Sequence, residues 1–114
     1  MGIKIAVIGA GSVGFTRGIS RDILTVPELQ DTHFAYHDIN GHNLDMVAQL
    51  MERDIAANGV PAKITTTLDR REALDGADYV LSFVRIGGLE AFETDVDIPL
   101  KFGVDQWVGD TLSP

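Results

Sequence analysis

Cysteine is absent from this chain, so neither a disulfide framework nor a thiolate metal site can form within its 114 residues. Positive charge is scarce as well: nine Lys and Arg residues against 17 Asp and Glu residues give a formal net charge of -8. This balance argues against nucleic acid or an anionic membrane surface as a partner. No apolar run approaches the ~18 residues that span a bilayer, and the first residues do not resemble a secretory signal. We therefore expect a soluble, cytoplasmic protein.

What the sequence does contain is an alternation of short β-branched runs with longer amphipathic segments. The expected strands are residues 3–8, 33–39, 63–67 and 78–84. The expected helices are residues 12–25, 40–58 and 69–76, and a weaker helical pattern follows at 90–97 before Pro99 interrupts it. Strands that alternate with helices in this order predict an α/β fold with a doubly wound parallel sheet of the Rossmann type. Four strands correspond to the N-terminal half of that fold.

Three glycines follow the first expected strand directly. The segment GAGSVG at residues 9–14 matches the pattern G-x-G-x-x-G and lies between an expected strand and an expected helix. In this pattern the first glycine permits a tight turn, the second lets a pyrophosphate approach the backbone, and the third lets helix and strand pack closely. The N-terminus of the helix offers free amides and a partial positive charge to the phosphates. The predicted dinucleotide loop consists of Gly9, Ala10, Gly11, Ser12, Val13 and Gly14.

An acidic residue lies where a ribose-binding carboxylate is expected. Asp38 stands near the end of the second expected strand, 24 residues after Gly14, where the acid is expected about 20 residues on. A carboxylate there accepts hydrogen bonds from the ribose hydroxyls and repels a 2′-phosphate. The pattern therefore favours NAD over NADP as the cofactor.

The motifs together resemble the N-terminal region of glycoside hydrolase family 4, over essentially the whole chain. The segments that carry the resemblance are KIAVIGAGSVGFTR, DILTVPEL, HDIN, ADYVLSFVRIGG, DIPLKFGV and VGDTLSP. The glycine pattern is generic, whereas DIPLKFGV and GDTLSP are much more specific. For the cofactor site, the resemblance adds Phe15, Ile39, Asn40 and Val84. For the substrate site, it implies Arg85, Gly87 and Gly88.

This resemblance implies a glycosidase outside the usual scheme of two catalytic carboxylates. In the family, NAD+ removes hydride from C3 of the sugar, and a divalent metal, usually manganese, polarises the resulting ketone. The C2 proton is then removed, the leaving group is eliminated, water adds, and the hydride returns. The metal ligands, the acid and the base lie further along in family members. We therefore expect residues 1–114 to be a truncated NAD-binding domain, inactive alone, from a homo-oligomer (a dimer or tetramer).

The resemblance also bears on the substrate. Members that act on 6-phosphorylated sugars typically carry R-V-G-K, with a second arginine four residues after the lysine. Here Arg85 matches, but Gly88 replaces the lysine and Phe92 replaces the second arginine. We therefore expect a small unphosphorylated α-glycoside as substrate, either an α-galactoside or an α-uronide, and an α-glucoside stays open.

Two alternatives remain. A lactate- or malate-type dehydrogenase shares the glycine pattern, but it would be expected to place an arginine-rich loop after the fourth strand, and GGLEAFETDVD contains no arginine. A non-catalytic nucleotide-binding module is compatible with a chain that lacks the catalytic half. His33, His37 and His42 raise a metal-site hypothesis, but two of them lie on an expected strand, and we interpret all three as ordinary polar residues.

Overall fold

A computed structural model describes residues 2–105, and the chain divides into two compact units, Met1–Val84 and Arg85–Pro114. The motif GDTLSP at residues 109–114, one of those that carry the family resemblance, lies outside the described residues. The first unit contains a four-stranded sheet. Its strands are β1 (Lys4–Ile8), β2 (His33–His37), β3 (Lys63–Thr67) and β4 (Tyr79–Ser82).

Every pairing in this sheet is parallel, and the strand order is β3-β2-β1-β4. The chain therefore adds β2 and β3 on one side of β1 and then crosses to add β4 on the other side. The prediction of a parallel, doubly wound sheet is confirmed, because this is the order of the first half of a Rossmann fold. The second and fourth strands are shorter than predicted, so that Asp38, Ile39 and Val84 lie in loops at the carboxyl ends of the strands.

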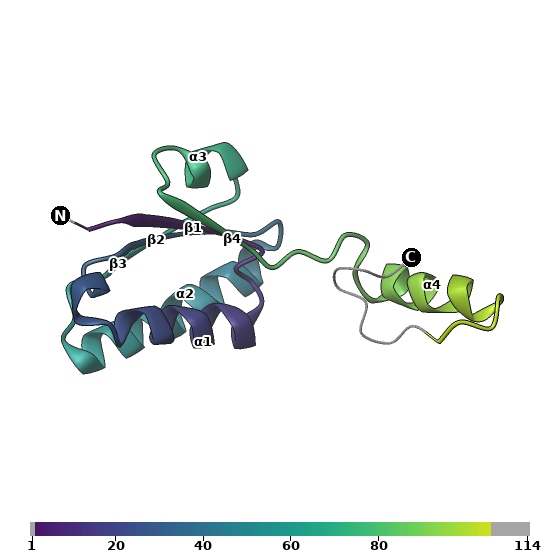
Figure 1. Cartoon of the computed structure of the whole chain (residues 1–114). Helices are drawn as coiled ribbons and strands as arrows, with labels where there is room; N and C mark the ends of the chain where they lie inside the picture. The colour runs from purple at the N-terminus through teal and green to yellow at the C-terminus, as the bar shows by residue number, and fades with distance from the viewer. Residues whose placement is uncertain (1, 106–114) are drawn as a thin grey trace. The chain divides into compact units, whose positions relative to one another are not determined.

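Helices connect the strands and cover both faces of the sheet (Figure 1). Those of the first unit are α1 (Val13–Leu24), the short 3-10 helix η1 (Pro27–Leu29), α2 (Gly41–Asn58) and α3 (Arg70–Leu74). Local capping sets the bounds of α2: Asn40 Oδ1 accepts a hydrogen bond from the Asn43 N–H at 3.1 Å, and Gly59 ends the helix at φ +63°.

The core lies between the sheet and the pair α1 and α2. Register places Ile5 beside Phe34 and Val7 beside Tyr36, and these side chains form one buried cluster with residues of α2, namely Leu44, Val47 and Met51. Ala6 and Ala35 alternate with them and face the opposite side, where α3 contacts β1 and β2. Because successive side chains of a strand point to opposite faces, the buried strand β1 is apolar throughout its centre.

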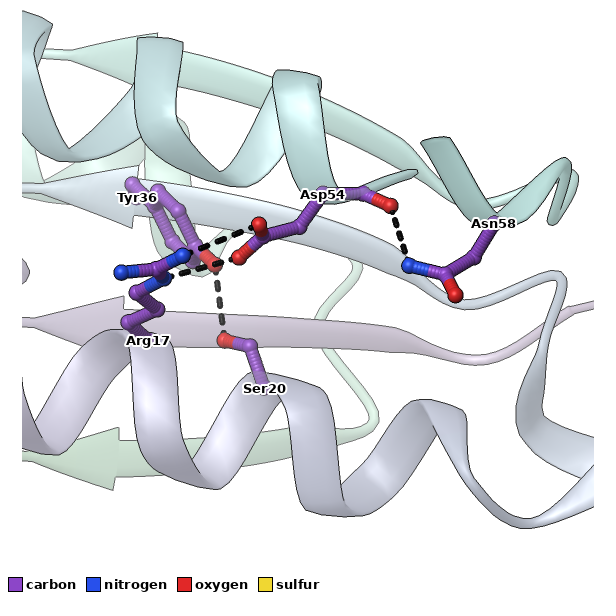
Figure 2. Close-up of polar contacts among 5 residues, drawn as sticks. All are labelled: Arg17, Ser20, Tyr36, Asp54 and Asn58. Carbon is purple, nitrogen blue, oxygen red and sulfur yellow. Dashed lines mark hydrogen bonds and ion pairs between the residues drawn. The ribbon is translucent and has the colours of Figure 1, made fainter. Parts of the chain in front are cut away.

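Polar contacts attach α1 to α2 and to the sheet (Figure 2). The Arg17 guanidinium donates two hydrogen bonds to the Asp54 carboxylate, at 2.8 and 3.1 Å. The Ser20 and Tyr36 hydroxyls are hydrogen-bonded at 2.7 Å, and both side chains are buried. The phenol ring of Tyr36 belongs to the apolar core. Its buried hydroxyl group therefore needs a hydrogen-bond partner, and the Ser20 hydroxyl provides one.

The second unit contains one helix within its described residues, α4 (Gly88–Leu100). This helix is longer than the predicted segment 90–97, and the expectation that Pro99 would interrupt it is wrong. Pro99 lies in the last turn, where its missing N–H removes only one i→i−4 hydrogen bond, and the helix ends one residue later. Among residues 2–105, no helix combines the length and apolar character that a bilayer crossing needs.

Candidate functional site

The glycine loop begins with a residue whose conformation excludes other side chains. Gly9 has φ +90°, and a Cβ at this position would lie 2.6 Å from the carbonyl oxygen of Phe83. The loop therefore passes directly against the end of β4. The predicted role of the first glycine in a tight turn is confirmed, with a close backbone approach in addition.

Hydrogen bonds fix this loop to the neighbouring strand and helix. The N–H groups of Gly9 and Ala10 both donate to the carbonyl oxygen of His37, each at 2.9 Å. The Thr16 hydroxyl donates to the Ala10 carbonyl at 3.0 Å and is buried. The His37 side chain is itself buried, and its Nδ1 has no hydrogen-bond partner among the described residues. These bonds fix the first two residues of the loop to the end of β2 and to the first turn of α1.

The second glycine meets the predicted ribose acid. The Gly11 N–H donates to Asp38 Oδ2 at 2.8 Å, and the Asn40 N–H donates to Asp38 Oδ1 at 2.9 Å. A Cβ at Gly11 would lie 2.7 Å from the same Oδ2 atom. Glycine is therefore required here for the approach of a carboxylate from its own chain. Two backbone amides orient the carboxylate, and each oxygen keeps further lone pairs for hydroxyl donors.

The helix that follows the loop begins with open backbone donors. Ser12 is the N-cap residue of α1, and within the described part of the chain its side chain makes no capping hydrogen bond. The first turn of α1 contains no acidic residue. The first N–H groups of a helix have no intrahelical partner, and the helix dipole adds a partial positive charge there. This arrangement can bind an anion such as a pyrophosphate.

The third glycine does not have the predicted role. A Cβ at Gly14 would meet no atom of residues 2–105 within 4 Å. Close packing of helix against strand therefore does not explain this glycine, and that expectation is wrong. Two residues further along, the buried Thr16 hydroxyl attaches the start of the helix to the loop.

Exposed apolar side chains occur beside the glycine loop and in the segments that follow the other strands. Phe15 is 65% exposed and Ile39 is 92% exposed. Leu68, directly after β3, and Val84, just after β4, are exposed as well. Sequence reasoning missed Leu68, which directly follows the third strand as Asp38 directly follows the second. Apolar groups gathered at one edge are typical of a ligand-binding surface.

Asn40 has a structural function that the sequence only partly indicated. Its side-chain oxygen caps α2, and its own N–H holds Asp38. The side chain predicted to contact the cofactor is thus already engaged by the helix. The remaining contribution of Asn40 to the site is the orientation of the carboxylate.

The predicted substrate residues belong to the second unit. The Arg85 guanidinium carbon lies 4.6 Å from the centre of the Phe92 ring. Gly87 is the N-cap of α4 at φ +81°, and Gly88 follows at φ +64°. A Cβ at Gly87 would lie 2.5 Å from the Ala91 Cβ, so glycine is needed there.

A cavity of about 340 Å³ lies away from the glycine loop, between the C-terminal halves of α1 and α2. Leu24, Met51 and Ile55 are among its lining residues. Its lining includes no residue of the glycine loop, because it lies at the opposite end of α1. Among residues 2–105, no group of three or more His, Asp and Glu side chains is placed to hold a metal ion.

Comparison with known proteins identifies the family of this chain. The model of the family 4 glycosyl hydrolases matches residues 4–114. An alpha-galactosidase of Rhizobium meliloti (strain 1021) is 56% identical over 109 residues, which make up 96% of this chain and 22% of that protein.

Two solved structures share the fold. One is a 6-phospho-alpha-glucosidase from gut microorganisms in complex with NAD and glucose-6-phosphate, with TM-score 0.76 and 30% identity over 93% of this chain and 24% of that one. The other is the 6-phospho-beta glucosidase of Thermotoga maritima with manganese, NAD+ and glucose-6-phosphate, with TM-score 0.77 and 29% identity over 90% of this chain and 24% of that one. The chain thus spans about a quarter of the length of these relatives. Because the family match extends over nearly all residues, this chain belongs to the family 4 glycosyl hydrolases.

Proposed function

We propose that this chain is the NAD+-binding part of a glycosidase that hydrolyses an unphosphorylated α-glycoside, most simply an α-galactoside. The observation that carries the proposal is the pair formed by the Gly11 amide and the Asp38 carboxylate beside the open N-terminus of α1. A carboxylate for a ribose and free amides for a pyrophosphate then stand next to each other at the edge of the sheet where nucleotides bind.

The residues present fit a dinucleotide without a 2′-phosphate. Asp38 would accept hydrogen bonds from the adenosine ribose hydroxyls, and its charge would repel a phosphate on the 2′ oxygen. The amides of Val13 and Gly14 would donate to the pyrophosphate. When bound, NAD+ supplies an acceptor for hydride from the sugar. The two similar solved structures that contain NAD support this assignment of the cofactor.

The proposed substrate class rests on two residues of the second unit and on the name of one relative. Phe92 stands where phosphate-binding members of the family bring a second arginine, and its ring lies against Arg85. Gly88 offers no side chain where those members have a lysine. A phosphate dianion would lose two charge-assisted hydrogen-bond partners. The relative that shares 56% identity is an alpha-galactosidase, which favours an unphosphorylated galactoside.

A divalent metal, manganese by analogy with one solved relative, belongs to this proposal for the whole protein. The described residues do not form its site, since no suitable group of three or more ligands occurs among them. We therefore assign no step of the reaction to a metal held by residues 2–105. Their contribution is to bind and orient the dinucleotide.

The whole protein provides the test. Bound NAD+ and metal are removed, and hydrolysis of a chromogenic α-galactoside is measured with neither, either or both added back. We expect activity only with both NAD+ and Mn²⁺, and much lower activity on the 6-phosphorylated galactoside. Hydrolysis that persists without NAD+ would contradict the proposal. Net NADH formation from a hydroxy acid would favour the dehydrogenase alternative instead.

A further inference from the structure

The two halves of a bound dinucleotide would lie over different strands. Strands β2 and β4 flank β1, and the strand order reverses between β1 and β4. If Asp38 after β2 binds the adenosine ribose, which rests on the proposed function, the pyrophosphate lies over the end of β1. The other half of the molecule then extends toward the end of β4, because dinucleotides cross the sheet edge at this switch point.

An aromatic pair stands on that side of the loop. The rings of Phe15 and Phe83 have centroids 5.8 Å apart and planes inclined by 27°. Phe83 follows β4 and packs against the core cluster, whereas Phe15, in the first turn of α1, leaves most of its ring in contact with solvent. Phe83 thus connects the Phe15 ring to the core. An exposed aromatic ring held in this way is available to a ligand.

We propose that the Phe15–Phe83 pair forms an aromatic surface that contacts the nicotinamide ring of the bound cofactor. The oxidised nicotinamide ring is a flat cation, and the face of an aromatic ring attracts a cation within about 6 Å of its centre. The reduced ring is neutral and lacks this attraction. The pair therefore favours NAD+ over NADH, as well as the nicotinamide-bearing molecule over ADP-ribose.

This proposal is tested by measuring the dissociation constants of NAD+, NADH and ADP-ribose for the full chain, by titration calorimetry at fixed salt. For Phe15→Leu we expect NAD+ to bind about two- to fivefold more weakly. The affinity for NADH should fall less, and the affinity for ADP-ribose should be unchanged. Ile39→Ala is the matched control from the β2 side of the loop, and it should weaken NAD+ and ADP-ribose by the same factor.

Phe15→Leu should fold, because the ring is mainly exposed. Phe83→Leu provides a second variant with the same expected pattern, and its melting temperature is recorded alongside. An equal loss of NAD+ and ADP-ribose in both phenylalanine variants, or no loss at all, would overturn the inference. If the unchanged protein binds neither NAD+ nor ADP-ribose, the proposed function itself fails. If it binds both, only the comparison between ligands decides the role of the pair.

Discussion

The Asp38 carboxylate accepts a hydrogen bond from the Gly11 backbone N–H at 2.8 Å, although 27 positions separate the two residues. We predict that Gly11→Ala lowers the free energy of unfolding by about 1.5–3 kcal/mol, since the new Cβ must displace this charge-assisted bond. It should also weaken NAD+ binding. Urea denaturation measures the first effect and calorimetric titration the second.

Gly14→Ala is the control for this prediction. Its Cβ would enter open space among the described residues, and alanine is favoured over glycine in a helix by about 1 kcal/mol. Stability should therefore stay the same or rise. A loss equal to that of Gly11→Ala would show that the close approach to Asp38 is not what requires glycine.

The charge of Asp38 should set the choice between NAD+ and NADP+. In Asp38→Asn, we expect the ratio of the NADP+ to the NAD+ dissociation constant to fall by about tenfold, equivalent to ~1.4 kcal/mol, because the repulsion of the 2′-phosphate is removed. Asp45→Asn removes the same charge from the exposed surface of α2 and should leave the ratio unchanged. Equal changes in the two variants would indicate a general effect of net charge.

The buried Ser20–Tyr36 hydrogen bond should behave as a coupled pair. Either single variant, Ser20→Ala or Tyr36→Phe, should lose about 1 kcal/mol of unfolding free energy, since each leaves a buried hydroxyl unpaired. The double variant should lose less than the sum of the two. Additive losses in urea denaturation would contradict the coupling.

Alkaline pH offers an independent test of Tyr36. Burial raises the pKa of Tyr36 to about 12, and the bond to Ser20 offsets part of that rise. The folded state therefore keeps this phenol protonated longer than the unfolded chain does. Its contribution to stability is fully present below the ordinary pKa of about 10 and is lost as pH rises toward 12. Phenolate absorbance of the unchanged protein minus that of Tyr36→Phe should show a titration shifted in this direction.

The Arg17–Asp54 ion pair predicts a pH dependence at the acid end. The hydrogen bond from Arg17 holds the pKa of Asp54 below its ordinary value. The stabilisation is therefore complete above the unfolded pKa of about 3.9 and is lost as pH falls through the folded value. Arg17→Met should be slightly less stable than the unchanged protein at neutral pH, and the difference should disappear in acid.

Thermal denaturation across this pH range measures that difference. Arg70→Met, which removes an exposed arginine from the first turn of α3, serves as the comparison. Its difference from the unchanged protein should show no step at the titration of Asp54. A step of equal size in both variants would mean that overall charge, and not the ion pair, governs acid stability.

Local features could be predicted from the sequence because they depend on residues close together in the chain. The β-branched run of β1, the Asn40 cap and the Gly59 terminus all involve interactions within a few residues. The alternation of these elements also predicted the parallel sheet. The length of α4 was underestimated, because a proline in a last helical turn leaves the preceding turns intact.

Contacts between residues far apart in the chain could be known only from the folded structure. The order of elements, the glycine pattern, the candidate acid and the family resemblance could be read from the amino-acid sequence, since each depends on a short run of residues. It did not determine that Gly11 touches Asp38, that Gly14 faces open space, or that Phe15 stacks on Phe83. These relations arise where separate strands end at one edge of a sheet, and the packing of the whole core fixes that alignment.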